Sequence, residues 1–446
     1  MQDSLSALTR YEFTRRRFLW CLSMSAAGMV AGCAANPVTG KKQLMLVSRE
    51  QEIQMDRQYA PMQLSSDYGK VQDLGLNQYV DSVGQSMAAK THRPDMPYSF
   101  RVVNATYVNA YAFPGGTIAC TRGIMLALEN EAELAALLGH ELGHVNARHS
   151  AEQMSKGMIT QTVAGGLAVL AGTQGAAYGQ IASQLGSIGA GALLASYSRD
   201  NEREADDLGM RYMVGSGYNP QGMVGLMDVL RSMSKHKPST IDLMFATHPM
   251  SDERYQTAVT TVRKKYAAAG DMTLQRDRYM DHTAKLRRQR EAVEALQDGE
   301  KELYQKKFDR AEAKFGRALG VAPNDYAGLI MMSKCQLLQS KHKAGLDYAK
   351  RARTVYPQEA QAYHLIGFAQ MNLKDYESAY QNFGDYQQRL PLDPNPSFFR
   401  GYCQEQMQHR EAAAREYQAY LKNVQQGKYA QYAYSRMVEW GYYQKP

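Results

Sequence analysis

The chain is poor in cysteine and tryptophan, with five and two of them among 446 residues. So few cysteines exclude a small scaffold held together by disulfide bonds. Cys120, Cys335 and Cys403 lack the paired spacing of a cysteine zinc site, so we expect them to be buried thiols. Hydrophobic residues still make up 44% of the sequence, which excludes a disordered chain and suffices for two or three folded domains.

One long segment also lacks charge: positions 157–198 hold no acidic or basic residue. The segment is rich in glycine and alanine, and glutamines at 174, 180 and 184 break its apolar runs. A membrane hairpin is one interpretation, but a spanning helix takes about 20 consecutive apolar residues, more than either piece offers. The pattern favours two helices that pack over the neighbouring domain and could cover its cleft.

The N-terminus has the order of an export signal. A basic stretch that includes Arg15–Arg17 precedes an apolar run, and the residues VAGC follow, ending at Cys33. The triple arginine resembles a twin-arginine export motif, and the last four residues resemble a bacterial lipobox, in which the cysteine is acylated. We therefore expect a signal peptide over residues 1–32 and a lipid anchor at Cys33 that holds the chain to a membrane. An ordinary signal peptide with an incidental cysteine is the alternative.

The middle of the chain contains the pattern HExxH at residues 140–144. Strong helix formers precede it from Glu131 onward, so the pattern is expected on a helix. The spacing places His140 and His144 on one face, one turn apart, where both imidazoles can bind a single ion at about 2.0–2.1 Å. Glu141 lies beside them and can reach a water molecule on that ion. The pattern therefore predicts a catalytic metal site.

A catalytic zinc site needs a third protein ligand and one open position. The candidates lie downstream, in the segment NEREAD. Glu202 and Asp206 are four residues apart and share a helix face, whereas Glu204 points off that face and is the weaker candidate. His149, five residues beyond His144, is rotated away from the ligand face, so we expect it to be structural or on the surface.

The C-terminal third repeats itself with a period of 34 residues. Prolines 323, 357 and 391 keep that step, and so do the small residues Ala311, Gly345, Ala379 and Ala413. This is the tetratricopeptide period, in which each repeat is a hairpin of two helices and the stacked repeats form a concave surface. We expect repeats at about 292–325, 326–359, 360–393 and 394–427, followed by a capping helix. Their surface is expected to bind peptides or partner proteins.

Four stretches together resemble the HtpX and CAAX prenyl protease family of zinc metallopeptidases, which are gluzincins with HExxH followed by ExxxD. They are NAYAFPGG at 109–116, HELGHVNARH at 140–149, NEREADDLG at 201–209 and THP at 247–249. The opening ANPVTGKKQL and the C-terminal repeats resemble the periplasmic BepA-like branch of that family. The resemblance thus reaches most of the chain.

The resemblance implies a metal site of known composition. It implies one Zn²⁺ per chain, bound by His140, His144 and Glu202. It further implies that Asp206 accepts a hydrogen bond from His140 and so fixes its tautomer. Glu141 is then the general base in metal-assisted hydrolysis of peptide bonds.

The resemblance also implies residues that meet the substrate. Asn109, Ala110 and Tyr111 correspond to the edge strand of a small sheet, along which an extended peptide pairs through its backbone. His248 and Arg254 match a motif that lies near the zinc ion. In the BepA-like branch this histidine can take the open zinc position and keep the enzyme latent; alternatively, His248 or Arg254 polarises the scissile carbonyl. The sequence does not choose between these roles.

The net charge of +8 gathers in part at Lys285–Arg290, between the two halves of the chain. An exported chain does not routinely meet nucleic acid, so no nucleic-acid partner is expected. We favour a solvated connecting helix, with contact to an anionic membrane surface as the alternative.

These features together predict a mainly α peptidase domain with a small β-sheet (α+β), followed by an all-α tetratricopeptide solenoid. The expected boundaries are 1–32 for the signal peptide, 33–265 for the peptidase domain, 266–291 for a helical connector and 292–446 for the repeats. The expected protein is a zinc metalloendopeptidase of the bacterial periplasm, anchored to the outer membrane as a lipoprotein. It would cleave misfolded or stalled envelope proteins, and its repeats would bind substrates or the outer-membrane assembly machinery. The alternative is a periplasmic chaperone or scaffold with a latent peptidase site.

Overall fold

The computed structural model describes residues 33–40, 42–155, 197–236 and 238–444. The expected signal peptide and nearly all of the uncharged segment lie outside the described residues. The described chain opens with a two-stranded antiparallel sheet of β1 (Cys33–Ala35) and β2 (Lys42–Leu44). Two helices follow it, α2 (Arg49–Ser66) and α3 (Leu74–Ala88).

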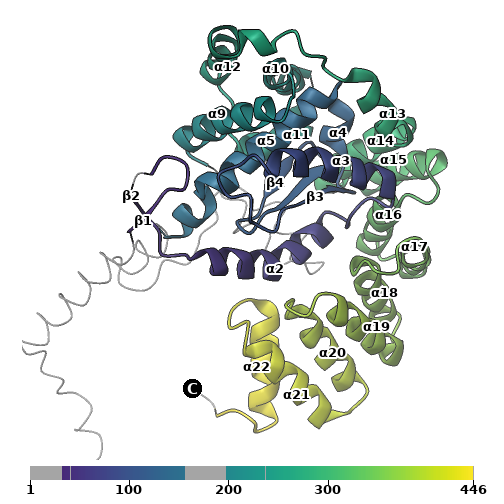
Figure 1. Cartoon of the computed structure of the whole chain (residues 1–446). Helices are drawn as coiled ribbons and strands as arrows, with labels where there is room; N and C mark the ends of the chain where they lie inside the picture. The colour runs from purple at the N-terminus through teal and green to yellow at the C-terminus, as the bar shows by residue number, and fades with distance from the viewer. Residues whose placement is uncertain (1–32, 41, 156–196, 237, 445–446) are drawn as a thin grey trace, which may run out of the picture.

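One helix, α5 (Glu131–Ala147), runs through the middle of the N-terminal unit (Figure 1). The Asn130 side chain begins it by accepting a hydrogen bond from the Glu133 amide at 2.9 Å. Every residue of α5 is buried. A helix buried on all sides belongs to the interior of a domain, because it has no polar face to offer to water. Its neighbours are α3, α9 (Arg199–Gly215), α10 (Gln221–His236) and a small sheet.

That sheet has three strands in the order β3-β5-β4, with bounds Ser99–Val103, Thr117–Thr121 and Ala110–Ala112. β3 is parallel to β5, whereas β4 is antiparallel to it, with Tyr111 opposite Ala119. β4 is therefore an edge strand. The short helix α4 (Arg122–Ala127) follows β5 directly and leads into α5.

The helices α5 and α9 cross in direct backbone contact at small residues. A Cβ atom added to Gly209 would lie 2.7 Å from the backbone nitrogen of His140, and one added to Gly143 would lie 2.8 Å from the Cα atom of Ala205. Both distances are shorter than real Cβ contacts, so the two helices approach this closely only because glycine occupies these positions.

The rest of the chain is helical. After α10 come α11 (Pro238–Thr247), α12 (Asp252–Lys265), the short η1 (Ala267–Ala269) and α13 (Arg276–Arg288). The repeats then form the pairs α14 (Arg290–Tyr304) with α15 (Phe308–Val321), α16 (Tyr326–Leu338) with α17 (His342–Val355), α18 (Gln361–Asn372) with α19 (Tyr376–Arg389), and α20 (Asn395–Gln406) with α21 (Arg410–Leu421), before a last helix, α22 (Lys428–Glu439). The expected fold class is confirmed: a mainly helical domain with a small sheet, then an all-α solenoid. Cys120, Cys335 and Cys403 are buried free thiols, as expected.

The repeat helices curve round beneath α2, and the first helix of each early pair lies on the inner side of the curve (Figure 1). The end of α2 and the residues after it, Ser65–Lys70, pack against these inner helices, and we call them the docking segment. Tyr68 donates a hydrogen bond to Glu300 of α14 at 3.1 Å, and its ring lies under the Lys334 ammonium of α16, 4.9 Å from the ring centre. The Ser65 hydroxyl donates to Glu359 just before α18. The chain itself thus contacts the inner helices of the first two repeats and the residue just before α18.

The basic connector is not simply solvated. Arg287 and Arg290 donate hydrogen bonds to the backbone carbonyls of Leu128 and Leu126, at 2.5 and 2.7 Å. These carbonyls lie at the C-terminal end of α4, where a helix has unsatisfied acceptors and attracts cations. The connector therefore uses part of its charge to attach the repeats to the peptidase unit, which differs from the expectation.

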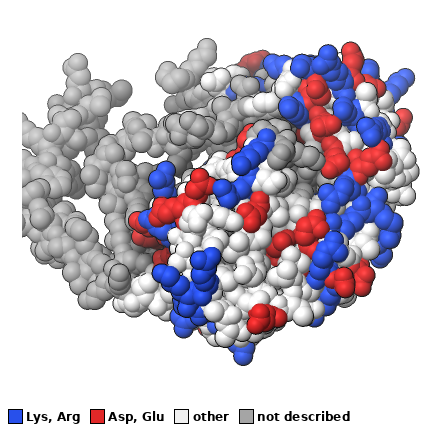
Figure 2. All heavy atoms as spheres, turned by 90° about the horizontal axis from the view of Figure 1, so that it is seen from above, with Lys and Arg blue, Asp and Glu red and all other residues white. Residues whose placement is uncertain are grey.

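The surface carries both signs of charge in close mixture. Figure 2 shows lysine, arginine and acidic side chains interleaved over the face seen from above, with uncharged surface between them. This face of the described chain offers no broad basic area of the kind that binds nucleic acid. No helix within the described ranges is long and apolar enough to cross a membrane.

Candidate metal centre

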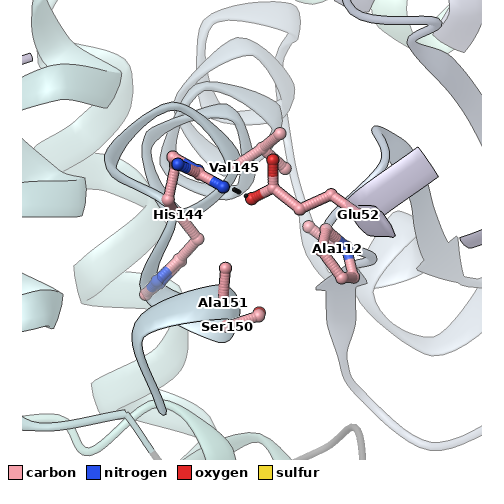
Figure 3. A pocket seen from close by; sticks show the side chains of 8 residues that line it. Glu52, Ala112, His144, Val145, Ser150 and Ala151 are labelled. Atoms are coloured by element: carbon pink, nitrogen blue, oxygen red, sulfur yellow. Dashed lines mark hydrogen bonds and ion pairs between the residues drawn. The ribbon is translucent and has the colours of Figure 1, made fainter. Parts of the chain in front are cut away.

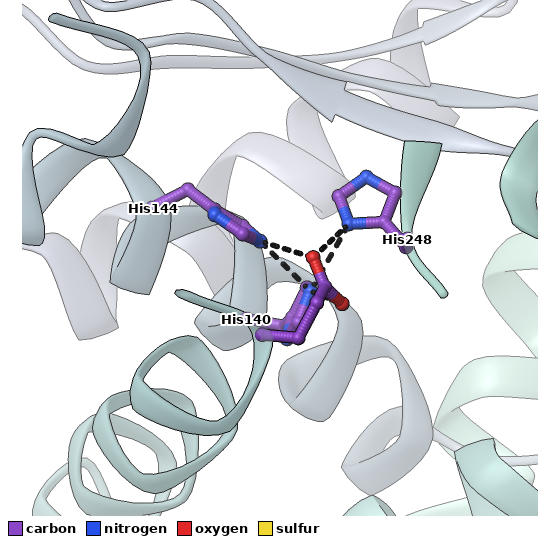
Figure 4. Close-up of side chains that lie close together, drawn as sticks. His140, His144 and His248 are labelled. Atoms are coloured by element: carbon purple, nitrogen blue, oxygen red, sulfur yellow. Dashed lines mark hydrogen bonds and ion pairs between the residues drawn. The ribbon is translucent and has the colours of Figure 1, made fainter. Parts of the chain in front are cut away.

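Two helices and the loop after a third bring His140, His144, Glu202 and His248 together (Figure 4). The first two come from α5, Glu202 comes from the first turn of α9, and His248 follows α11. All four side chains are buried, and one ligand atom of each lies within 4.8 Å of every other. Sequence positions more than a hundred residues apart therefore converge on one small volume.

The ligand atoms are spaced as around a single ion. The Nε2 atoms of His140 and His144 are 3.0 Å apart, and Nδ1 of His248 is 3.3 Å from Nε2 of His140. Glu202 Oε1 lies 3.1 Å from Nδ1 of His248 and 3.3 Å from Nε2 of His144. A tetrahedral zinc ion with bonds of about 2.0–2.1 Å separates its ligand atoms by about 3.3–3.4 Å. Nitrogen and carboxylate donors at these separations fit such an ion.

The electrostatics of the cluster also call for a cation. Burial lowers the pKa of His140, but the carboxylates of Glu202 and Asp206 outweigh burial and raise this pKa to about 10. Burial raises the pKa of Glu202, but His140 and His248 outweigh it and hold this pKa well below its usual range. The site thus keeps a carboxylate ionised in the interior and draws positive charge next to it.

Asp206 and Arg254 support the cluster from one side. The Nδ1 atom of His140 lies 2.9 Å from Asp206 Oδ1. Arg254 donates to both oxygens of Asp206, at 2.7 and 2.8 Å, and its Nη1 reaches the Pro249 carbonyl at 2.9 Å and Glu202 Oε2 at 2.7 Å. All three guanidinium nitrogens of Arg254 therefore contact the chain itself. These contacts fix the side chains of His140, Asp206 and Glu202 relative to one another.

Glu141 is the unusual carboxylate of the site. Both of its oxygens are buried and have no hydrogen-bond partner among the described residues. The Nε2 atom of His248 lies 3.7 Å from Oε1 of Glu141. Burial raises the pKa of Glu141. A buried carboxylate without a partner is expensive, so its presence beside a metal-type donor set indicates that a ligand of the site completes its hydrogen bonding.

The edge strand β4 lies next to the histidines. A narrow cavity runs between them, with Ala112 and Pro114 on one side and His144, Ser150 and Ala151 on the other (Figure 3). Ala110 and Tyr111 are buried, and the Tyr111 hydroxyl donates to Asp67 of the docking segment at 2.5 Å.

Asn109, directly before β4, also carries polar atoms without partners. Within the described part of the chain, neither Nδ2 nor Oδ1 of its side-chain amide has a hydrogen-bond partner, although both atoms are buried. Of the residues expected to meet a substrate, Asn109 thus leaves hydrogen-bonding capacity unused within the described chain.

The sequence analysis did not predict the positions of three residues near the cluster. His149 is buried, and its Nδ1 lies 2.9 Å from Nδ1 of His144, while its Nε2 lies 3.2 Å from Glu204 Oε2. The Tyr197 ring stacks on the His144 ring at 3.8 Å. The αL conformation of Arg148, with a φ of 62°, turns the chain so that His149 faces back toward His144. Nothing in the sequence marks that turn, because glycine or asparagine is the usual residue there.

Comparison with known proteins agrees with this geometry. The profile of peptidase family M48 matches residues 75–262, a range that contains all four residues of the cluster. Over these residues the chain is similar to peptidase family M48. This match confirms the resemblance to the metallopeptidase family that the sequence indicates.

Several curated proteins are similar to this part of the chain. The beta-barrel assembly-enhancing protease of Yersinia pestis is 30% identical over 48% of this chain and 44% of its own length. The protein of that name from Escherichia coli K12 is 28% identical over 47% and 43%. Metalloprotease YcaL of Escherichia coli K12 is 36% identical over 36% and 60%. The matched part of the chain thus spans about half the length of these relatives.

Solved structures of tetratricopeptide proteins resemble the chain only distantly. YrrB, described as a TPR protein with an unusual peptide-binding site, is 13% identical and covers 47% of this chain and 99% of its own, with a TM-score of 0.32. A score this low assigns no fold. The repeat architecture rests instead on the helix pairs and on the 34-residue period.

Proposed function

We propose that the chain is a zinc-dependent endopeptidase in which His140, His144 and Glu202 bind the ion and Glu141 acts as the general base. The observation that carries the proposal is the buried Glu141 carboxylate, which accepts no hydrogen bond from any described residue and lies beside a donor set with the spacing of a zinc site. The similarity of residues 75–262 to peptidase family M48 supports the reaction class.

Bound zinc supplies a Lewis acid that activates water and polarises the scissile carbonyl. In the proposed mechanism Glu141 takes the proton of the attacking water and passes it to the leaving amine. Its raised pKa, caused by burial, suits a group that must both accept and release a proton near neutral pH. Asp206 keeps the proton of His140 on Nδ1, so that Nε2 is free to bind, and Arg254 holds Asp206 in place.

The proposed substrate is an extended peptide that pairs with the edge strand at Asn109, Ala110 and Tyr111. An exposed strand edge offers backbone donors and acceptors to an incoming chain. The unused amide atoms of Asn109 would meet the substrate backbone. A narrow cavity next to this strand is lined by Ala112 and by His144 of the cluster.

The test is cleavage of casein by the purified chain, with and without a chelator, together with measurement of bound zinc. Glu141→Gln is expected to retain about one zinc per chain and to lose activity, whereas Glu253→Gln, at an exposed site on α12, is expected to keep both. A Glu141→Gln variant that cleaves at the wild-type rate, or a wild-type chain without metal, would contradict the proposal.

A second function is favoured by one observation, the presence of His248 within the cluster. Its Nδ1 sits among the other ligand atoms, where it would supply a fourth protein donor. Four protein ligands are typical of closed zinc sites, whereas a catalytic site keeps one position open. A chaperone or scaffold whose peptidase site is latent therefore remains the second candidate. It predicts that the wild-type chain binds zinc but leaves casein intact and prevents aggregation of an unfolded outer-membrane protein.

We further propose that the protein acts in the bacterial envelope on misfolded or stalled outer-membrane proteins, as a lipoprotein anchored through Cys33. The relatives named beta-barrel assembly-enhancing protease support this setting. In this proposal residues 33–265 form the peptidase domain, 266–291 the connector and 292–446 a repeat domain that binds substrates or assembly machinery. Membrane fractionation of the wild type and of Cys33→Ser tests the anchor, because only the wild type should sediment with outer membranes.

A further inference from the structure

The two α5 histidines of the cluster are supported differently on their outer side. Nδ1 of His140 meets a carboxylate directly, that of Asp206. Nδ1 of His144 instead meets a second imidazole, that of His149, at 2.9 Å. The other nitrogen of His149 meets Glu204 at 3.2 Å. His149 is 1% exposed, so its contacts are made within the protein and not through solvent.

The hydrogen-bond partners determine where the protons of this chain of side chains lie. An ionised carboxylate only accepts, so Glu204 requires the proton of His149 on Nε2. A neutral imidazole protonated on Nε2 has its lone pair on Nδ1, which accepts the Nδ1 proton of His144. His144 is then left with a lone pair on Nε2, the atom that faces Glu202 and His140. The order Glu204–His149–His144 thus selects the tautomer that can bind a metal.

The backbone conformation of Arg148 places His149 next to His144. In a continuous helix a residue five positions on is turned by about 140° from the first. The left-handed conformation of Arg148 interrupts α5 and returns His149 to the ligand side. Arg148 is itself held by Glu52 at 3.0 Å and by the Val47 carbonyl at 2.6 Å.

We propose that His149 and Glu204 are positioning residues that act in series to fix the tautomer and ring orientation of His144, and thereby set the metal affinity of the site. This rests on the proposed function, in which His144 is a zinc ligand. Outer partners of metal-bound histidines typically change metal affinity by about 10- to 100-fold when they are removed.

The test measures zinc dissociation constants of the full chain by competition with a chromophoric chelator, and the visible spectrum after loading with Co²⁺. Glu204→Ala and His149→Leu are each expected to weaken zinc binding by about 10- to 100-fold. His149→Asn is expected to stay close to the wild type, because its amide oxygen can accept the His144 proton near the place of Nδ1. Asp207→Ala, an exposed acid of α9 paired with Lys265, is the matched control and should not change the affinity.

The serial arrangement adds a sharper requirement. Adding Glu204→Ala to His149→Leu should weaken binding no further, because Glu204 acts only through His149. Additive losses, or an unchanged affinity in Glu204→Ala, would overturn the inference. Since the Glu204 side chain is 30% exposed, its variant is expected to fold even if His149→Leu does not. A wild-type chain that binds no zinc would refute the proposed function itself, which distinguishes that failure from failure of the positioning role alone.

Discussion

Arg122 of α4 forms a buried ion pair with Asp325, the residue that caps the N-terminus of α16. The two side chains are 3% and 4% exposed, and Arg122 also donates to the Asn104 carbonyl at 2.9 Å. The pair joins the peptidase unit to the second repeat. Because a buried charge that loses its partner cannot be solvated, Arg122→Ala is predicted to lower the free energy of unfolding by about 3–5 kcal/mol.

Urea unfolding of the full chain measures this effect. The matched control is Arg317→Ala, which removes an exposed pair with Glu291 and should change stability by no more than about 1 kcal/mol. Equal effects of the two substitutions would mean that the buried pair does not hold the units together.

Removal of His248 is predicted to raise the peptidase rate. Its Nδ1 lies 3.3 Å from Nε2 of His140, so in a zinc-loaded chain it could take the position that a catalytic zinc site leaves open. His248→Ala should therefore cleave casein several-fold faster than the wild type while it retains zinc. His409→Ala, at an exposed histidine of the repeats, should leave the rate unchanged. A loss of activity in His248→Ala would instead assign this histidine to the substrate carbonyl.

Lys334 is predicted to give the chain a stability that rises with pH in the alkaline range. Burial lowers its pKa to about 8, although Glu300 opposes this, whereas an unfolded lysine titrates near 10.4. Between about pH 8 and 10.4 the unfolded chain therefore binds more protons at this site, so the contribution of Lys334 to stability rises with pH.

Comparison with Lys334→Met isolates this contribution. Urea unfolding at pH 7.5 and 9.5 should show the wild type gaining stability relative to Lys334→Met at the higher pH. Lys307→Met, at a lysine that is 47% exposed, should show no such change. Parallel pH profiles of wild type and Lys334→Met would refute the prediction.

The contact of α5 with α9 predicts opposite outcomes for two glycines of one helix. A Cβ atom at Gly209 would meet the backbone of His140 at 2.7 Å, whereas one at Gly215 would meet nothing within 4 Å. Gly209→Ala should lower stability by about 1–3 kcal/mol and weaken zinc binding, because the helices must separate. Gly215→Ala should be neutral or slightly stabilising. Thermal unfolding and zinc titration of both variants check this, and similar behaviour of the two would contradict it.

The sequence predicts those parts of the molecule that depend on local spacing. HExxH on a helix follows from the four-residue step between His140 and His144, and the solenoid follows from a 34-residue period. Both signals depend on fixed spacings along the chain. They can therefore be recognised without knowing which distant segments contact each other.

Features that depend on unpatterned distant contacts were not predicted. The docking segment contacts the inner helices of the repeats through single pairs such as Tyr68 with Glu300, which follow no spacing rule in the sequence. His149 was expected to be structural or on the surface because a continuous helix was assumed, and the αL conformation of Arg148 breaks that assumption. Tertiary contacts with Glu52 and Val47 stabilise this conformation, so it is invisible to helix periodicity.

The contacts of the docking segment can form only late in the synthesis of the chain. Ser65 and Glu359 are separated by 294 positions, and Arg122 and Asp325 by 203. At about 5–20 residues per second, a ribosome needs roughly 15 to 60 s to pass from Ser65 to Glu359. Contacts this distant in sequence also form slowly once both ends exist. A chain interrupted within its repeats would therefore keep Tyr68 and its neighbours uncovered, which makes the unfinished chain the form most prone to aggregate.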